Sequence, residues 1–281
     1  MTEFGLLQKK GIIGFTDGIK TIQNSRLMSR IMRSAFDLGC LIMQHAEDNE
    51  LSQNGMMNDG VIATKLGLQG IPEVAEKIII ERDLSLLEDF NCRYHISQIS
   101  SSKSLEVIEK KKDQIDFTTG VSINNLSLNE NDIGDFRTFL KLSPPLRTEE
   151  DRQSLIRGIN KDLIEVLVSD HKPEDEESKR LTFSQAATGA SGIETLLPLS
   201  LELFHNNSIK LPKIIKLLTS NPAKVLKVDK GNLSIGNDAD FCIVDVNKPW
   251  IVKKEKMISK SKNTCIEDKK LQGKVTNTFV K

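Results

Sequence analysis

The sequence predicts an α/β protein built on a parallel sheet, and two observations carry that prediction. Short apolar runs alternate with amphipathic segments over the first 226 residues, and these runs are apolar enough to be buried on both faces. Polar residues stand where the runs end, at Asp17, His45, Gln98 and Asp170. Because the carboxyl ends of parallel strands form one rim in a barrel, these side chains are expected to meet there.

Apolar runs bounded by turn residues or charges mark the expected strands. They span residues 11–17, 40–45, 92–100, 114–122 and 162–170. About five strand–helix units are too few to close an eight-stranded barrel. The sequence therefore predicts either an open sheet or a TIM-type (β/α)8 barrel whose first strands are absent.

Helices are expected between and after these strands. Apolar residues recur at helical spacing from Ser25 onward, and Gly39 is the expected stop of that helix. Pro72 opens a second amphipathic helix, and Thr148 is the expected cap of another over residues 148–160. Further helices are expected over 102–113, 193–206 and 211–226.

The chain changes character after residue 226. A strand is expected at 240–246, and the last residues, from 273 onward, alternate between apolar and polar. We therefore expect two units: a barrel portion over residues 1–226 and a small C-terminal β portion over residues 227–281.

The composition excludes several classes of protein. Lys plus Arg equals Asp plus Glu at 39 each, so no net charge attracts nucleic acid or an anionic membrane. No apolar run approaches the ~18 residues of a membrane span. The four cysteines lack any CxxC pair, and Cys40, Cys92 and Cys242 lie in apolar runs. Buried free thiols are therefore expected, as in a cytoplasmic protein.

Several stretches stand out together and in a fixed order. They are GFTDG (14–18), QHAED (44–48), GIPEVAE (70–76), SPPLRTEEDR (143–152) and SDHKP (169–173), followed by SKRLTFSQAATGASGIETLLPL (178–199), GNDADFCIVD (236–245) and SKSKNTCIEDKKLQGKV (259–275). Spaced as here, the set resembles the class I dihydroorotases of the amidohydrolase superfamily. The resemblance implies a metal-dependent (β/α)8 barrel with a β-sandwich formed from both termini. It also implies the reversible cyclisation of N-carbamoyl-aspartate to dihydroorotate in pyrimidine biosynthesis.

The resemblance assigns roles to four positions near the strand ends. His45 matches the fifth-strand metal ligand. Asp170 matches the eighth-strand aspartate that carries the proton, and it is also a candidate metal ligand. Asp17 falls in the fourth-strand loop, where many relatives have two consecutive aspartates, and is a further candidate ligand. Gln98 stands at a usual histidine position, and its amide oxygen is a poorer ligand for zinc, the expected cofactor. The metal site is therefore expected to be degraded.

His95, three residues before Gln98, is not expected to replace the missing histidine ligand. Strand side chains alternate with a period of two residues. If Gln98 faces the site, His95 is expected to face the helices.

The substrate-binding positions that the resemblance implies also differ from the usual pattern. Ser143 stands where many relatives have asparagine, and Glu174 stands where a second histidine is usual. A carboxylate there would repel a dianionic substrate. Thr188 and Gly189 match a loop whose backbone contacts the substrate ring in the family. A related cyclic amide therefore stays open as the substrate.

Two functions follow from the resemblance. The first is a dihydroorotase-type cyclic amidohydrolase. The second is a non-catalytic dihydroorotase-like protein that serves as a structural partner of aspartate transcarbamoylase. The chain has four histidines and no His-x-His pair, and it begins near the family's fourth strand, so an N-terminally incomplete barrel is expected. The unpaired edge strands of such a barrel predict that the chain associates with a partner or with a second copy of itself.

Overall fold

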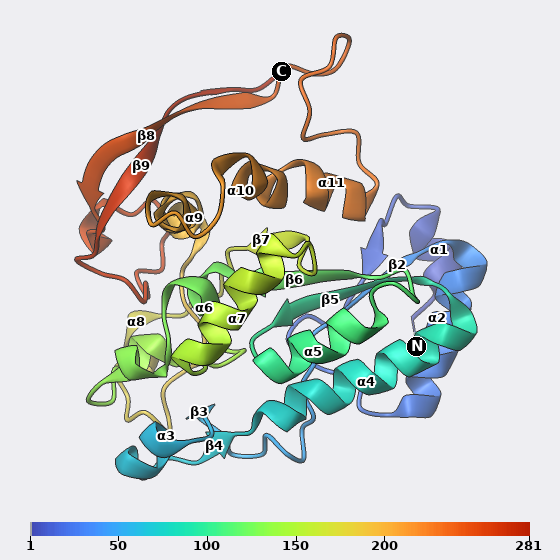
Figure 1. Cartoon of the computed structure of the whole chain (residues 1–281), viewed down its shortest axis with the longest axis horizontal. Helices are drawn as coiled ribbons and strands as arrows, with labels where there is room; N and C mark the ends of the chain where they lie inside the picture. The colour runs from blue at the N-terminus through green and yellow to red at the C-terminus, as the bar shows by residue number, and fades with distance from the viewer. Residues whose placement is uncertain (1) are drawn as a thin grey trace.

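A parallel sheet forms the centre of the computed structural model, which describes residues 2–281. Its five strands lie in the order β1-β2-β5-β6-β7 (Figure 1). They are β1 (Gly14–Phe15), β2 (Leu41–Gln44), β5 (Arg93–Ile99), β6 (Thr118–Ser122) and β7 (Val166–Val168). All four neighbouring pairs are parallel. The predicted α/β class is confirmed, and the sheet is open, with β1 and β7 as its edge strands.

Helices in the first part of the chain follow the strands, as a strand–helix repeat requires. They are α2 (Ser25–Leu38), α4 (Glu73–Phe90), α5 (Ser102–Lys111) and α7 (Glu149–Asn160), and successive ones pack against each other. Asn24 caps the start of α2, and Gly39 ends it with a φ of 64°. Thr148 caps α7 in a capping box with Asp151. The predicted stop and cap are confirmed.

Short elements fill the connections. They are α1 (Phe4–Gln8), β3 (Met57–Asn58), α3 (Val61–Leu66), β4 (Gly70–Ile71), α6 (Ile123–Ser127), η1 (Glu130–Ile133), η2 (Thr138–Leu140), α8 (Glu176–Lys179), η3 (Ile193–Thr195) and η4 (Lys254–Lys256). The β3–β4 pair is held to the body by the Asn58 side chain, which donates a hydrogen bond of 2.7 Å to Glu130. The connection from β2 to α4, which contains β3, α3 and β4, is therefore held against the rest of the fold.

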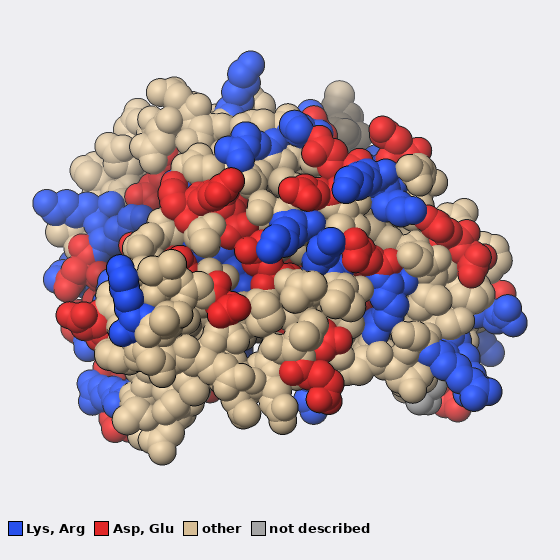
Figure 2. All heavy atoms as spheres, turned by 60° about the horizontal axis from the view of Figure 1, so that its bottom comes forward, with Lys and Arg blue, Asp and Glu red and all other residues tan. Residues whose placement is uncertain are grey.

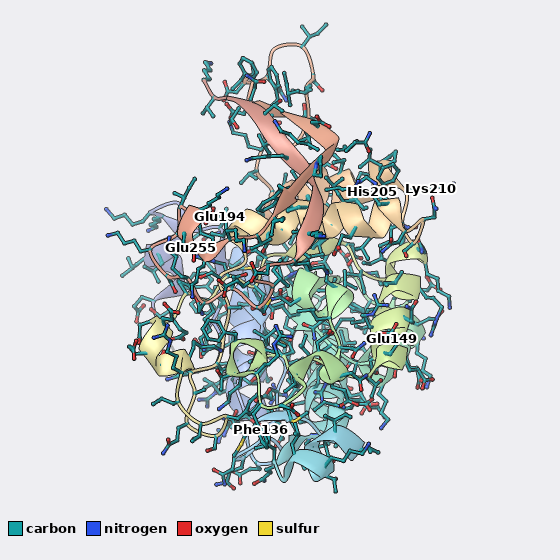
Figure 3. The ribbon with its side chains drawn as sticks, turned by 90° about the vertical axis from the view of Figure 1, so that its left-hand side faces the viewer. Phe136, Glu149, Glu194, His205, Lys210 and Glu255 are labelled. Carbon is teal, nitrogen blue, oxygen red and sulfur yellow. The ribbon has the colours of Figure 1, made fainter. Side chains whose placement is uncertain are left out.

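The C-terminal part adds three helices and a hairpin. The helices α9 (Leu196–His205), α10 (Leu211–Leu218) and α11 (Ser220–Leu226) lie between the sheet and the hairpin of β8 (Phe241–Ile251) and β9 (Lys270–Phe279) (Figure 1). Figure 3 shows this hairpin projecting from the body, with His205 beside it, and the His205 Nε2 atom lies 3.0 Å from the Val246 carbonyl oxygen. The division after residue 226 stays a prediction.

One burial expectation is wrong. Cys40, Cys92 and Cys265 are free and buried, but Cys242 is free and exposed. The reason is that β8 belongs to a two-stranded hairpin whose residues are mostly exposed on both faces. An apolar run in such a ribbon does not enter a core.

Charges of both signs are interspersed over the surface. In Figure 2 the Lys and Arg side chains alternate with Asp and Glu over the face shown, which agrees with the balanced composition. Within residues 2–281, no helix has both the length and the apolar character that crossing a membrane requires.

A strand glycine gives a direct test of the sheet. A Cβ at Gly120 would lie 2.4 Å from the Ser97 carbonyl oxygen and 3.1 Å from His95 Nε2. Because a backbone atom cannot yield cheaply, we expect Gly120→Ala to lower the free energy of unfolding by about 1–3 kcal/mol. Urea unfolding measures this effect. The control is Gly5→Ala, whose Cβ would meet nothing within 4 Å; equal midpoints for the two variants would contradict the packing described.

Candidate functional site

The carboxyl ends of β5, β6 and β7 bring three polar side chains together. Asp170 follows β7 and has a φ of 48°, a left-handed backbone conformation that aspartate tolerates better than most residues. Gln98 Nε2 donates to Asp170 Oδ1 at 3.1 Å, and Ser122 Oγ donates to Asp170 Oδ2 at 3.4 Å. Each carboxylate oxygen of Asp170 therefore has its own donor.

Burial changes the proton affinity of Asp170. It raises the pKa of this carboxyl to about 6, although the hydrogen bonds from Gln98 and Ser122 and the charge of Lys172 act in the opposite direction. A carboxylate with a pKa near neutrality can both accept and return a proton at physiological pH. Asp170 is therefore chemically suited to general base and acid work.

His45 lies at the end of β2 and is almost fully buried. Its Nε2 atom lies 3.5 Å from Ser143 Oγ and 4.0 Å from Glu47 Oε2. Burial lowers the pKa of His45, and the charge of Lys172 lowers it further, against the opposing charges of Glu47 and Glu76. The imidazole is therefore held neutral at pH 7, the form that accepts hydrogen bonds and binds metals.

Asp17 is not part of this cluster. It is exposed in the loop after β1 and lines a separate pocket with Phe15 and Gln44. Across residues 2–281, no three His, Cys, Asp or Glu side chains gather in a way that could hold a metal ion. At the Asp170 end, an amide N–H group points where a ligand lone pair would be needed. The residues of this chain therefore do not fit the metal centre that the resemblance implies.

The expected orientation of His95 is wrong. The Tyr94 hydroxyl bonds to Asp83 on α4, so Tyr94 faces the helices. His95, its neighbour, faces the opposite side and places Nδ1 2.8 Å from Thr118 Oγ1. A register shift in the second half of β5 breaks the strict alternation, so Gln98 reaches that same side.

His95 nevertheless does not replace a ligand at the rim. It lies three residues before Gln98 on β5, and its ring is bonded to Thr118 at the start of β6. Burial lowers the pKa of His95 to about 4, so the ring is neutral. The ring is buried and its hydrogen-bond partner is Thr118, not a residue of the Asp170 cluster.

The expected substrate positions lie around the same rim. Ser143 approaches His45 as described above. The Glu174 carboxylate lies 3.7 Å from the ammonium of Lys172. Gly189 is buried with a φ of 133°, and Thr188 beside it is half-buried.

Lys172 was missed as a site residue in the sequence interpretation. Its backbone N–H donates to the Ala190 carbonyl at 2.8 Å, and a Cβ at Gly189 would lie 2.6–2.7 Å from the Lys172 side-chain carbons. Its charge acts on both His45 and Asp170. In the sequence, the position of Lys172 directly after Asp170-His171 is the only indication that it belongs to the site, and this indication is weak.

A buried network behind the rim was also missed. The Glu76 carboxylate accepts hydrogen bonds from the backbone and hydroxyl groups of Ser100 and Ser101. Arg147, from the SPPLR stretch, donates to Ser100 Oγ at 3.1 Å and to Asn58 Oδ1 at 2.9 Å. Glu76 acts electrostatically on His45. The network therefore joins β5, α4 and the 143–147 segment beneath the site.

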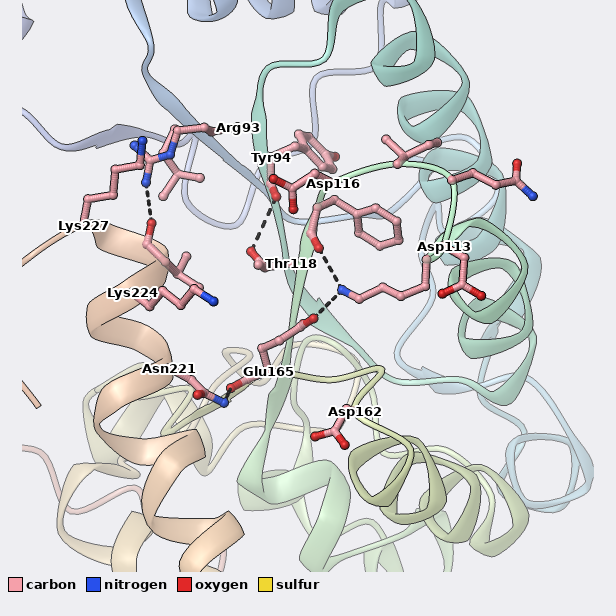
Figure 4. Close-up of a pocket in the computed structure, with 16 residues that line it drawn as sticks. Arg93, Tyr94, Asp113, Asp116, Thr118, Asp162, Glu165, Asn221, Lys224 and Lys227 are labelled. Carbon is pink, nitrogen blue, oxygen red and sulfur yellow. Dashed lines mark hydrogen bonds and ion pairs between the residues drawn. The ribbon is translucent and has the colours of Figure 1, made fainter.

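A large pocket lies at the other end of the sheet (Figure 4). Its volume is about 870 Å³, and its lining includes Arg93 and Thr118, the first residues of β5 and β6. Lys112 forms an ion pair with Glu165 in this lining. Figure 4 shows the Asn221 side chain beside Glu165, whose backbone carbonyl accepts a hydrogen bond from it. In a parallel sheet all strands start at one edge and end at the opposite edge. This pocket, at the strand starts, is therefore separate from the Asp170 cluster at the strand ends.

Comparison with known sequences identifies the family. Residues 1–104 match the family model described as dihydro-orotase-like. The whole chain is 39% identical to the dihydroorotase of Ehrlichia canis and 38% identical to that of Syntrophus aciditrophicus. The chain spans 63% of the length of the first relative and 66% of the second.

Solved structures agree on the fold. The L-hydantoinase (dihydropyrimidinase) of Arthrobacter aurescens superposes with a TM-score of 0.86 at 24% identity, over 99% of this chain and 65% of that one. The dihydropyrimidinase of Brevibacillus agri gives a TM-score of 0.86 at 18% identity, over 98% and 64% of the two chains. The chain therefore belongs to the dihydroorotase family and shares the α/β fold of these two solved structures.

Proposed function

We propose that this chain is a dihydroorotase-type cyclic amidohydrolase. It would interconvert dihydroorotate and N-carbamoyl-aspartate, a step of pyrimidine biosynthesis, in the cytoplasm. The observation that carries the proposal is the Asp170 carboxyl at the end of β7, with its pKa near neutrality, in a chain related to dihydroorotases over its whole length.

The proposed chemistry uses Asp170 as a proton carrier. In the hydrolytic direction Asp170 takes a proton from a water molecule as the water oxygen attacks the ring carbonyl carbon. The carbon–nitrogen bond then breaks, and Asp170 returns the proton to the leaving nitrogen. Ser143, Thr188 and Gly189 would contact the ring, and Glu174 would lie at its edge.

Zinc is the cofactor that the family resemblance implies, with His45, Asp17 and Asp170 as its candidate ligands. Asp17 lies apart from the other two, and no three potential ligands gather among the described residues, so no step is assigned to a metal. If one zinc ion binds to this chain, His45 is the residue whose neutral imidazole could hold it.

The test is a direct assay in both directions. Purified chain is incubated with dihydroorotate, and with N-carbamoyl-aspartate, and product is separated by chromatography. Turnover that Asp170→Asn abolishes supports the proposal. Absence of turnover in a chain with a normal circular dichroism spectrum and a cooperative thermal transition would overturn it.

A second candidate is a non-catalytic partner of aspartate transcarbamoylase. The Glu174 carboxylate favours this candidate, because it sits beside the site and would repel a dianionic substrate. The two open sheet edges also leave strands that a partner, or a second copy, could pair with. Co-elution with aspartate transcarbamoylase on size exclusion, by a chain without turnover, would identify this role.

A further inference from the structure

The Asp170 cluster contains donors in the places where a metal centre needs acceptors. Gln98 offers an amide N–H to one carboxylate oxygen of Asp170, and Ser122 offers a hydroxyl to the other. The reverse orientation of the Gln98 amide would place its oxygen against the carboxylate oxygen, which is repulsive. The carboxylate itself therefore fixes the amide with its donor side inward, where it offers no lone pair to a cation.

Lys172 follows Asp170 by two residues, and its positive charge acts to lower the pKa of both Asp170 and His45. The backbone of Lys172 is held on both sides, by Ala190 and by the Asn263 side chain, which donates to the Lys172 carbonyl at 3.2 Å. The aliphatic stem passes over Gly189, where no Cβ could be accommodated. The ammonium then lies 3.7 Å from Glu174. The Lys172 ammonium would repel a metal ion bound at this end of the site. It can also offset the negative charge of Asp170 and Glu174 when no metal is bound.

We propose that Gln98 and Lys172 together take the place of a metal ion at the Asp170 end of the site. Gln98 acts as a positioning residue that holds the Asp170 carboxylate by hydrogen bonding. Lys172 supplies the positive charge. The inference rests on the proposed function only in taking Asp170 as the working carboxylate.

The experiment measures metal binding independently of turnover. Elemental analysis and zinc titration are performed on the full chain, on Gln98→His, and on Gln98→His combined with Lys172→Ala. We expect no stoichiometric zinc in the parent. The combined variant should gain about one zinc per chain and lose it again on His45→Ala, because two imidazoles and Asp170 then form an acceptable donor set.

Gln53→His is the matched control, because Gln53 is exposed in a loop away from the cluster. Stoichiometric zinc in the parent that His45→Ala removes would overturn the inference. A folded combined variant that gains no more zinc than the Gln53→His control would also overturn it. The parent titration decides the first point even if the combined variant does not fold. Failure of the dihydroorotate assay is a separate result, because it leaves the metal content unchanged.

Discussion

Asp170→Asn is expected to lower any dihydroorotate turnover by about 10²–10⁴-fold, the usual contribution of a positioned proton carrier. The substitution keeps the shape of the side chain. Asparagine also tolerates the left-handed backbone at this position. Gln98 can still donate to the remaining oxygen, and Ser122 can accept from the new amide, so the loss would report chemistry.

The same substitution is expected to stabilise the fold at alkaline pH. The folded pKa of Asp170 is raised from 3.8 to about 6. Protonated Asp170 therefore makes its full contribution to the free energy of unfolding below the pKa of the unfolded state. This contribution is lost as the pH rises through about 6. Above that pH the native state carries an ionised, partly buried carboxylate, which costs about 2–3 kcal/mol.

Urea unfolding at about pH 8 and about pH 4.5 measures this difference. Asp170→Asn should raise the midpoint at the higher pH and change it much less at the lower one. Asp17→Asn is the control, because Asp17 is exposed. Equal shifts at the two pH values would show that burial of the charge is not the cause.

Arg147→Met is expected to lower the free energy of unfolding by about 3–5 kcal/mol, as for a broken buried charged network. The Arg147 side chain is almost fully buried and donates to Ser100, Asn58 and the Ile71 carbonyl. Methionine fills a similar volume but donates no hydrogen bond. These acceptors would be left without their donor, and the Glu76 carboxylate would lose the positive charge behind Ser100.

Guanidinium chloride unfolding measures the loss, with Arg26→Met as control, because Arg26 is exposed on α2. Arg147→Lys should recover only part of the stability, since one ammonium cannot reproduce the geometry of the guanidinium. Full recovery by lysine would show that charge alone stabilises this network. A loss no greater than that of the control would contradict the network.

Features set by neighbouring residues were predictable from the sequence. Gly39 ends α2, Pro72 precedes α4 and Thr148 caps α7, because each acts through its own backbone conformation or its own side chain. The five apolar runs likewise correspond to the five strands of the sheet. Their ends differ by a few residues, because pairing with the adjacent strand decides where each ends.

Features set by distant partners were not predictable. That His95 and Gln98 face the same side of β5 depends on a register shift against β6, and no local pattern encodes that shift. The bond from Arg147 to Asn58 joins residues 89 positions apart. Asp17 follows an apolar run, but only two residues of that run pair with β2, so its side chain is left exposed.

The register shift in β5 has a genetic consequence. It directs position 98 at Asp170 through the path of the backbone, whatever side chain position 98 carries. Glutamine and histidine codons differ only in their third base. One point mutation can therefore exchange a hydrogen-bond donor for a metal-binding imidazole at a position that the backbone already directs at Asp170.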